Sequence, residues 1–291
     1  KERAKMGQRD RWPPDNIYYE AAGLINRLLH FLRKSMSTEE MVRKVLEEHF
    51  GLQVEKIPEC EQKTPDFFAH NEEEKYLIEV KEKESNPEIA QGREEALSNG
   101  ELYEIAQSIE PKTTLANIVR SGKRQIDSFV EDDNTFRIVW VHCSGLAYSA
   151  TKDQILSGIY GSETVVDWGN EEAFSGTCYY FNESQFFRYR NDIDAVIVSC
   201  RNSEVQMCLN NHSPRYQALK SSSLSVNFKQ GLCDPLAQEQ DGIAFIVDAP
   251  IDRRDKSAVL NFLKEKYNTE KLMVMPMNHF EAHVAVPHDE M

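Results

Sequence analysis

The chain has 291 residues, of which 40% are hydrophobic and 10% aromatic; this excludes a chain that is disordered throughout and predicts a packed core. It contains no run of eighteen apolar residues, so we expect no membrane-spanning helix. The net charge of −14 argues against broad nucleic-acid binding, because Lys and Arg supply most of the affinity for phosphates, but the acidic residues occur in runs and leave room for a basic face elsewhere.

The cysteines and the first residues indicate where the protein resides. Six cysteines are scattered without a CxxC pair, and several lie in apolar, strand-like stretches where a free cysteine packs as a small hydrophobic residue. The sequence starts with charged residues, KERAKMGQRDRWPP, rather than with a basic segment followed by an apolar one. We therefore expect reduced cysteines, a cytoplasmic location and no association with a membrane.

Two helices and a strand are expected first along the chain. Residues 17–32 place apolar side chains at the i, i+3, i+4 spacing of an amphipathic helix. A second helix is expected from Ser37, which can cap it, to Gly51, which can end it, with one apolar stripe between them. Residues 52–57 then alternate apolar and polar side chains, which indicates a strand with one buried face.

A β-hairpin is expected next. Residues 65–69 and 76–81 are typical of two strands, joined by the polar turn 70–75. Residues 82–112 are polar and acidic and contain prolines and glycines, so we expect loops and short exposed helices there. A helix over residues 113–130 and a buried strand over residues 136–141 complete this part of the chain.

The second half of the chain carries weaker patterns. They predict a helix over residues 256–267 and strands over residues 195–199, 205–209, 243–247 and 272–275. We expect an α/β fold in which helices flank a mixed central β-sheet in residues 17–145. Residues 146–291 are expected to form an α/β extension that either continues the first sheet or packs a second layer on it.

Three charged residues of the hairpin point to a chemical function. Glu79 and Lys81 lie on the same face of a strand, and pairing of the hairpin places Asp66 on the neighbouring strand, with opposed Cβ atoms about 4.5–5.5 Å apart. Two carboxylates held together share a proton or bind a cation, and hard oxygen ligands suit Mg²⁺, with Mn²⁺ as a substitute. An ammonium beside the ion can hold the attacking water and stabilise charge on a phosphate. The pattern predicts metal-assisted hydrolysis of phosphodiesters.

The spacing of these residues also resembles a known signature. Pro65-Asp66, followed by Glu79-Val80-Lys81, is similar to the motif of the PD-(D/E)XK, or restriction endonuclease-like, nuclease superfamily. The resemblance covers roughly residues 37–142 and implies a mixed central sheet flanked by helices. It implies Asp66 and Glu79 as metal ligands and Lys81 as the catalytic lysine.

The resemblance implies two further sets of residues. Many members place a glutamate on the preceding helix at the metal site, and we prefer Glu39 to Glu40 because Glu39 shares the inward-facing stripe of that helix. The simpler alternative is a carboxylate that interacts with the helix dipole. A later helix often supplies substrate contacts, for which the candidates are Lys123, Arg124 and Gln125; the alternative for these is an exposed helical face.

Together these features predict a Mg²⁺-dependent nuclease that acts on DNA, as an effector in antiviral defence or in DNA processing with a protein partner such as a translocase. The sequence does not exclude that the protein forms a homo-oligomer. The alternative is a non-catalytic nuclease-like module that binds nucleic acid or a protein; the net acidity favours it, and so does a solvated strand face at Glu79 and Lys81. The sequence has no GxSxG elbow and no GxxxxGK[ST] loop, so ATP-driven chemistry would need a partner chain.

Other polar residues receive simpler interpretations. His279 and His283 are four positions apart and would share a helix face, as zinc ligands do, but the surrounding prolines favour a C-terminal tail. Asp192, Asp194 and Asp248 lie at the ends of strand candidates, where carboxylates often cap turns. We expect neither set to perform the chemistry.

Overall fold

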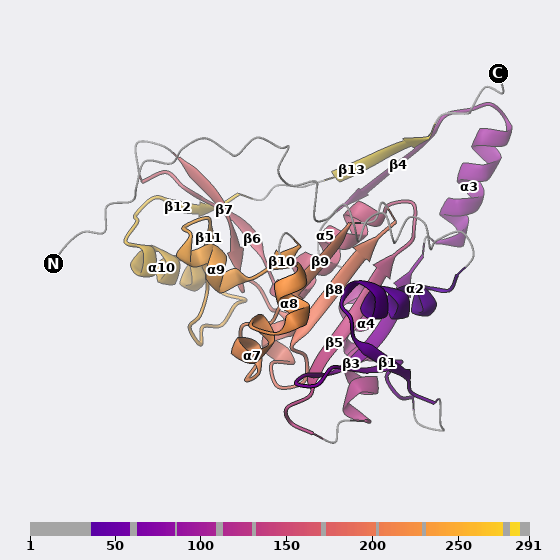
Figure 1. Cartoon of the computed structure of the whole chain (residues 1–291). Coiled ribbons are helices and arrows are strands. Elements are labelled where there is room, and N and C mark those ends of the chain that lie inside the picture. Colours follow the sequence, from indigo (N-terminus) through magenta and orange to yellow (C-terminus); the bar gives the residue numbers. More distant parts are fainter. Residues whose placement is uncertain are drawn as a thin grey trace.

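The computed structural model describes residues 36–58, 63–84, 86–108, 113–129, 132–169, 173–201, 204–228, 231–275 and 280–285. It shows a mixed α/β protein in which helices flank a large central sheet (Figure 1). A four-stranded sheet and a two-stranded sheet accompany the central one. The helix predicted over residues 17–32 lies outside the described residues.

The central sheet combines strands of both directions. Its seven strands lie in the order β1-β2-β3-β5-β8-β9-β10. The neighbours β3, β5 and β8 are parallel, as are β9 and β10, and the remaining neighbours are antiparallel. The strands are β1 Gln53–Lys56, β2 Phe67–His70, β3 Lys75–Lys83, β5 Phe136–Cys143, β8 Ala195–Cys200, β9 Val205–Leu209 and β10 Leu232–Cys233. The predicted hairpin and the strands predicted near residues 52, 136, 195 and 205 are confirmed.

The helix before β1 begins and ends where local sequence predicts. In α2 (Thr38–Lys44), the Ser37 hydroxyl accepts from the Glu40 amide while the Glu40 carboxylate accepts from the Ser37 amide, which forms a capping box. The helix continues as a π-helix, η1 (Val45–His49), and Gly51 follows with φ +67°, a backbone conformation that glycine adopts at low cost. The apolar stripe of this helix is buried against the sheet.

Different helices cover the two faces of the central sheet. One core joins the sheet to α2, α7 (Tyr216–Lys220) and α8 (Ser223–Phe228). The other joins it to α4 (Thr113–Asp127) and α5 (Tyr148–Tyr160). Strand β5 is buried along its whole length, as expected for the near-continuous apolar sequence of a central parallel strand. The helix predicted from residue 113 is confirmed.

The acidic segment after β3 was predicted to form loops and short helices, and the structure differs from this prediction. It contains a twelve-residue helix, α3 (Pro87–Ser98), none of whose residues is buried, and a strand, β4 (Tyr103–Ser108). Strand β4 pairs antiparallel with β13 (Phe280–Ala285), and these elements lie together at the upper right of Figure 1. Local sequence could not predict β4, because its partner is far away along the chain.

The second half of the chain both continues the central sheet and builds another. The second sheet has the order β11-β7-β6-β12, with strands β6 Glu163–Asp167, β7 Phe174–Tyr179, β11 Ala244–Ile246 and β12 Leu272–Val274. The remaining helices are α6 Gln185–Arg188, α9 Pro235–Gln240 and α10 Lys256–Tyr267. The predicted strands near residues 243 and 272 and the predicted helix over residues 256–267 are confirmed.

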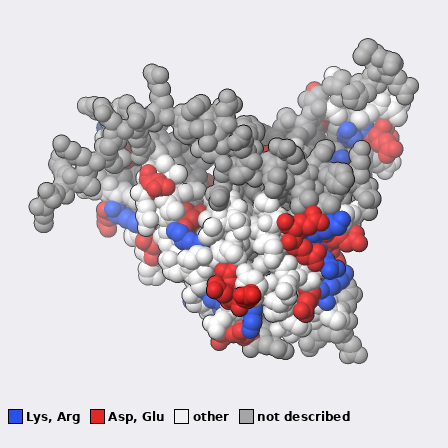
Figure 2. All heavy atoms as spheres, in the orientation of Figure 1, with Lys and Arg blue, Asp and Glu red and all other residues white. Residues whose placement is uncertain are grey.

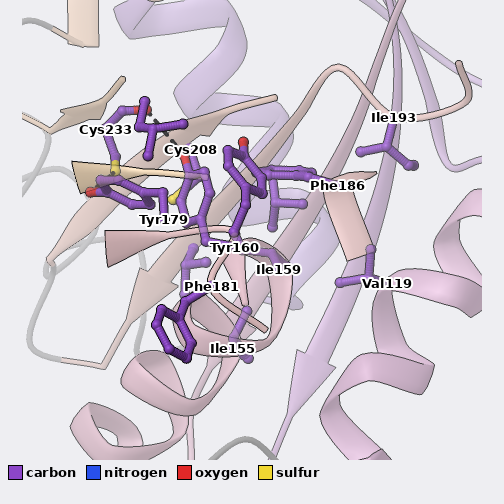
Figure 3. Close-up of a cluster of buried hydrophobic side chains, with 14 of the residues drawn as sticks. Val119, Ile155, Ile159, Tyr160, Tyr179, Phe181, Phe186, Ile193, Cys208 and Cys233 are labelled. Atoms are coloured by element: carbon purple, nitrogen blue, oxygen red, sulfur yellow. Dashed lines mark hydrogen bonds between the residues drawn. The ribbon is translucent and has the colours of Figure 1, made fainter. Parts of the chain in front are cut away.

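An aromatic cluster joins α5 to both sheets (Figure 3). The buried ring of Tyr160 lies 4.8 Å from that of Tyr179 on β7 and 5.0 Å from that of Phe186 on α6, between ring centroids. Its hydroxyl donates to the Leu209 and Cys233 carbonyls of the central sheet. The two sheets therefore share one core.

Among the helices of the described residues, none has the length and hydropathy of a membrane-spanning segment.

Candidate active site

The hairpin register brings the three motif residues together. Phe67 of β2 lies opposite Ile78 of β3, which places Asp66, one residue earlier, opposite Glu79. Asp66 Oδ2 accepts a hydrogen bond of 2.7 Å from the Val80 amide, which fixes this carboxylate against β3. The ammonium of Lys81 forms an ion pair with Glu79 Oε1. Two acids and one amine thus converge at one point of the sheet.

Strand alternation explains why Glu79 and Lys81 face α4. The side chains of Tyr76, Ile78 and Val80 belong to the core under α2, whereas Leu77 belongs to the core under α4. Glu79 and Lys81 share the face of Leu77, because successive side chains of a strand point to opposite faces. The polar cluster therefore lies beside the helix that follows it in the chain.

Glu79 is the most unusual group of this cluster. Its side chain is fully buried, and although Lys81 pairs with Oε1, neither carboxylate oxygen accepts a hydrogen bond of good geometry from the described residues. Burial raises the pKa of Glu79 to about 8, with the negative charge of Asp66 adding to the rise and Lys81 opposing it. Burial also raises the pKa of Asp66, which the Val80 amide opposes. The two carboxyl groups hold a proton more tightly than isolated ones.

Helix α4 packs against the cluster of Asp66, Glu79 and Lys81. A Cβ atom at Gly122 would lie 2.9 Å from a methyl group of Val139 and 3.4 Å from Glu79 Cγ, so the contact with Val139 requires glycine if the helix is to approach this closely without displacing its neighbours. One turn later, Gln125 Oε1 accepts a hydrogen bond of 2.6 Å from Lys81 Nζ. The sequence analysis missed Gly122, although a glycine inside an otherwise helical pattern often marks a close packing contact.

The other candidates of α4 lie apart from Lys81. The ammonium of Lys123 pairs with Asp127 and lies 3.6 Å from Asp192 and 5.9 Å from the centre of the Tyr189 ring. Arg124 is exposed. The structure therefore brings Gln125, but not Lys123, to the three motif residues.

Glu39 lies nearer to the cluster than Glu40 does. The negative charge of Glu39 adds to the rise in the pKa of Asp66 that burial causes, so the two carboxylates lie close enough to interact. Glu39 Oε2 also pairs with Lys56 Nζ at 2.7 Å, so a basic side chain already occupies it. Glu40 closes the capping box of α2 instead.

The oxygen donors of Asp66 and Glu79 suit a hard divalent cation that also binds water or substrate oxygens. Among the described residues, no three His, Cys, Asp or Glu side chains converge as a complete metal cage. Asp66 and Glu79 supply oxygen donors, and the buried Glu79 Oε2, which has no hydrogen-bond donor among the described residues, is an atom that a cation would satisfy. One or two carboxylates, with water and substrate oxygens as the remaining ligands, are what Mg²⁺ commonly takes. The two carboxylates therefore fit Mg²⁺.

A cleft of about 920 Å³ begins one residue beyond Lys81 along β3. Its walls are α3, the end of β3, the loop 144–146 and Arg201, and it carries both acidic and basic side chains. The face drawn in Figure 2 likewise shows acidic and basic side chains beside one another, without a continuous basic area among its coloured residues. Any phosphate contacts on this face are therefore made by individual cations.

The remaining polar candidates lie elsewhere. His283 belongs to strand β13 rather than to a helix, and His279 lies outside the described residues. The interpretation of residues 280–285 as a tail is wrong. Asp194 accepts hydrogen bonds from backbone and side chains at the start of β8, and Asp248 pairs with Lys266.

No protein-family model, no curated protein and no solved structure matches the chain.

Proposed function

We propose that this protein is a Mg²⁺-dependent nuclease with a restriction endonuclease-like core that hydrolyses phosphodiester bonds in DNA. One observation carries the proposal. Glu79 is fully buried opposite Asp66; its Oε1 pairs with the Lys81 ammonium, while its Oε2 has no hydrogen-bond donor among the described residues. Burying a charged group in this way costs stability unless a partner or a ligand compensates it, so such groups are concentrated at functional sites.

Each residue has a defined role in this proposal. Asp66 and Glu79 would hold Mg²⁺, and Glu39 would serve as an auxiliary donor only after leaving its ion pair with Lys56. The bound ion would polarise a phosphate oxygen and lower the pKa of bound water. The ammonium of Lys81 orients the attacking water and stabilises the negative charge that develops on the phosphate. Mn²⁺ takes the same oxygen donors and is expected to substitute.

The surroundings of the site suggest how a nucleic acid is bound. The cleft lies at the end of the strand that carries the motif, although none of Asp66, Glu79 and Lys81 lines it. Arg93 and Arg201 line this cleft and are candidates for phosphate contacts. Lys123, which does not line the cleft, remains a candidate for contacts with other phosphates of the same nucleic acid. The net charge of −14 supports action within a complex, for example with a translocase or in antiviral defence, rather than unaided binding to any DNA.

A cleavage assay on circular and linear DNA and RNA tests the proposal. The purified protein is expected to cut DNA with Mg²⁺ or Mn²⁺, and EDTA and Lys81→Ala are each expected to abolish the cutting. The matched control is Lys75→Ala, which removes an exposed lysine at the other end of β3 and should leave the activity unchanged. Equal activity in Lys81→Ala and wild type would overturn the role of Lys81.

A second candidate function is a nuclease-like module that binds nucleic acid or a protein without cutting. The observation that favours it is the interleaved charge on the face in Figure 2, together with the net acidity. Calorimetric titration with Mn²⁺ separates the two functions. A catalytic site should bind the ion and lose it in Asp66→Ala, whereas a non-catalytic module should bind DNA or a partner in EDTA as well as in Mg²⁺.

A further inference from the structure

Gln125 connects two of the proposed catalytic residues. Its Oε1 accepts from Lys81 Nζ at 2.6 Å, and its Nε2 donates to the Thr64 carbonyl at 3.1 Å. Thr64 lies two residues before Asp66, in the segment that leads into β2. A single amide therefore links the lysine of β3 to the backbone just before the aspartate of the neighbouring strand.

The same end of α4 makes a second contact with this segment. The Ser128 hydroxyl donates to the Lys63 carbonyl at 2.9 Å, one residue before the carbonyl that Gln125 holds. Gly122, one turn earlier, allows the helix to lie against Glu79. Helix α4, through Gly122 and Gln125, and Ser128 directly after it thus contact Glu79, Lys81 and the segment before Asp66.

We infer that Gln125 is a positioning residue, which holds Lys81 and the Asp66 segment in register, and that it is not a substrate ligand. Gln125 was predicted to contact substrate, but its carbonyl oxygen already accepts from the Lys81 ammonium and its amide nitrogen already donates to the backbone. A lysine side chain has several rotatable bonds, so a fixed acceptor restricts its ammonium to one place beside Glu79. The kinetic part of this inference rests on the proposed nuclease function, whereas the contact itself does not.

Two substitutions of Gln125 separate positioning from substrate binding. Gln125→Met has a similar length and no acceptor, and Gln125→Glu keeps an acceptor for Lys81 but loses the donor to Thr64. Positioning predicts that Gln125→Met lowers kcat about 10- to 100-fold with little change in KM for DNA, and that Gln125→Glu keeps more of kcat. Substrate binding predicts the reverse order, because a glutamate would repel phosphate and raise KM.

A labelling experiment tests the contact without any cleavage. Lys81 of the metal-free protein is acylated with a lysine-directed reagent, and its rate is measured by mass spectrometry against that of Lys75 in the same sample. We expect Lys81 to react several-fold faster in Gln125→Met than in wild type, because it has lost a hydrogen-bond partner, and Gln125→Glu to stay close to wild type. Gln217→Met, at an exposed glutamine of α7, is the matched control and should change neither rate.

The outcomes distinguish this inference from the proposed function. If wild type cuts no DNA but Lys81 reacts faster in Gln125→Met, the nuclease function fails and the positioning contact stands. If wild type cuts DNA and Gln125→Met keeps its kcat but raises KM, Gln125 is a substrate ligand and the inference is overturned. Unchanged labelling of Lys81 in a Gln125→Met protein that melts cooperatively would overturn it as well.

Discussion

Gly122 of α4 lies against the buried side chain of Glu79, so that a Cβ atom at position 122 would lie 3.4 Å from Glu79 Cγ and 2.9 Å from a methyl group of Val139. This close approach lets the helix cover the carboxylate and exclude water from it. Because burial is the largest cause of the raised pKa of Glu79, the glycine and the unusual acid are parts of one arrangement.

The contact predicts opposite effects for alanine at two helical glycines. Gly158 of α5 has nothing within 4 Å of its virtual Cβ, so Gly158→Ala should raise the free energy of unfolding by about 0.5–1 kcal/mol. Gly122→Ala gains the same helix propensity but overpacks Val139, at a cost of about 1–3 kcal/mol, so it should lower the free energy of unfolding. Urea denaturation measures both. Equal stabilisation by the two substitutions would show that α4 does not pack tightly against Val139 beside Glu79.

The raised pKa of Glu79 predicts how stability depends on pH. The folded protein holds a proton up to about pH 8 that the unfolded chain releases near its ordinary pKa of 4.5. The stabilisation from protonated Glu79 is therefore complete below pH 4.5 and is lost as the pH rises through 8. In the metal-free protein, Glu79→Gln should match wild type at the low end of this range and become more stable than wild type at the high end.

Urea midpoints measured across that pH range in EDTA give the comparison. The matched control is Glu73→Gln, in the exposed turn of the same hairpin, whose profile should run parallel to that of wild type. A constant difference between Glu79→Gln and wild type at every pH would mean that Glu79 titrates as an ordinary surface acid.

Local patterns predicted the parts of the fold that depend on neighbours in the sequence. The capping box of Ser37 and Glu40, the end of the helix at Gly51 and the alternation that orients Glu79 and Lys81 all act within a few residues. The pairing of Asp66 with Glu79 was also predictable, because a short polar turn fixes the register of a hairpin.

Contacts between distant segments could not be predicted in this way. Strand β4 exists through its pairing with β13, and the partner of Glu39 is Lys56. The two hydrogen bonds of Gln125 depend on how α4 crosses the hairpin, which no local pattern specifies. The substrate role predicted for Gln125 came from its position in the chain alone, and the structure supplies the contacts that favour a different one.

Asp194 is expected to matter for stability rather than for chemistry. It is fully buried before β8, where it accepts from the Arg137 amide and from Arg215 Nε, both at 2.8 Å, and from the Ser213 hydroxyl. Asp194→Ala leaves buried donors and the Arg215 charge without their acceptor and should cost about 3–5 kcal/mol. Asp252→Ala, which breaks a fully exposed pair with Arg254, should change the free energy of unfolding far less in the same denaturation experiment.

Metal addition and removal give the most direct test of the carboxylate pair. A cation held by Asp66 and Glu79 binds the folded protein and not the unfolded chain, so Mn²⁺ at about 100 times its Kd should stabilise the fold by about 2.7 kcal/mol. For a domain of this size that corresponds to a rise in Tm of roughly 5–10 °C, which EDTA should reverse. Asp66→Asn keeps an acceptor for the Val80 amide but loses the charge, so its Tm should not respond to Mn²⁺, whereas Glu73→Gln should respond like wild type. A rise of the same size in Asp66→Asn would mean that the ion binds elsewhere and that the buried pair of acids holds a proton instead.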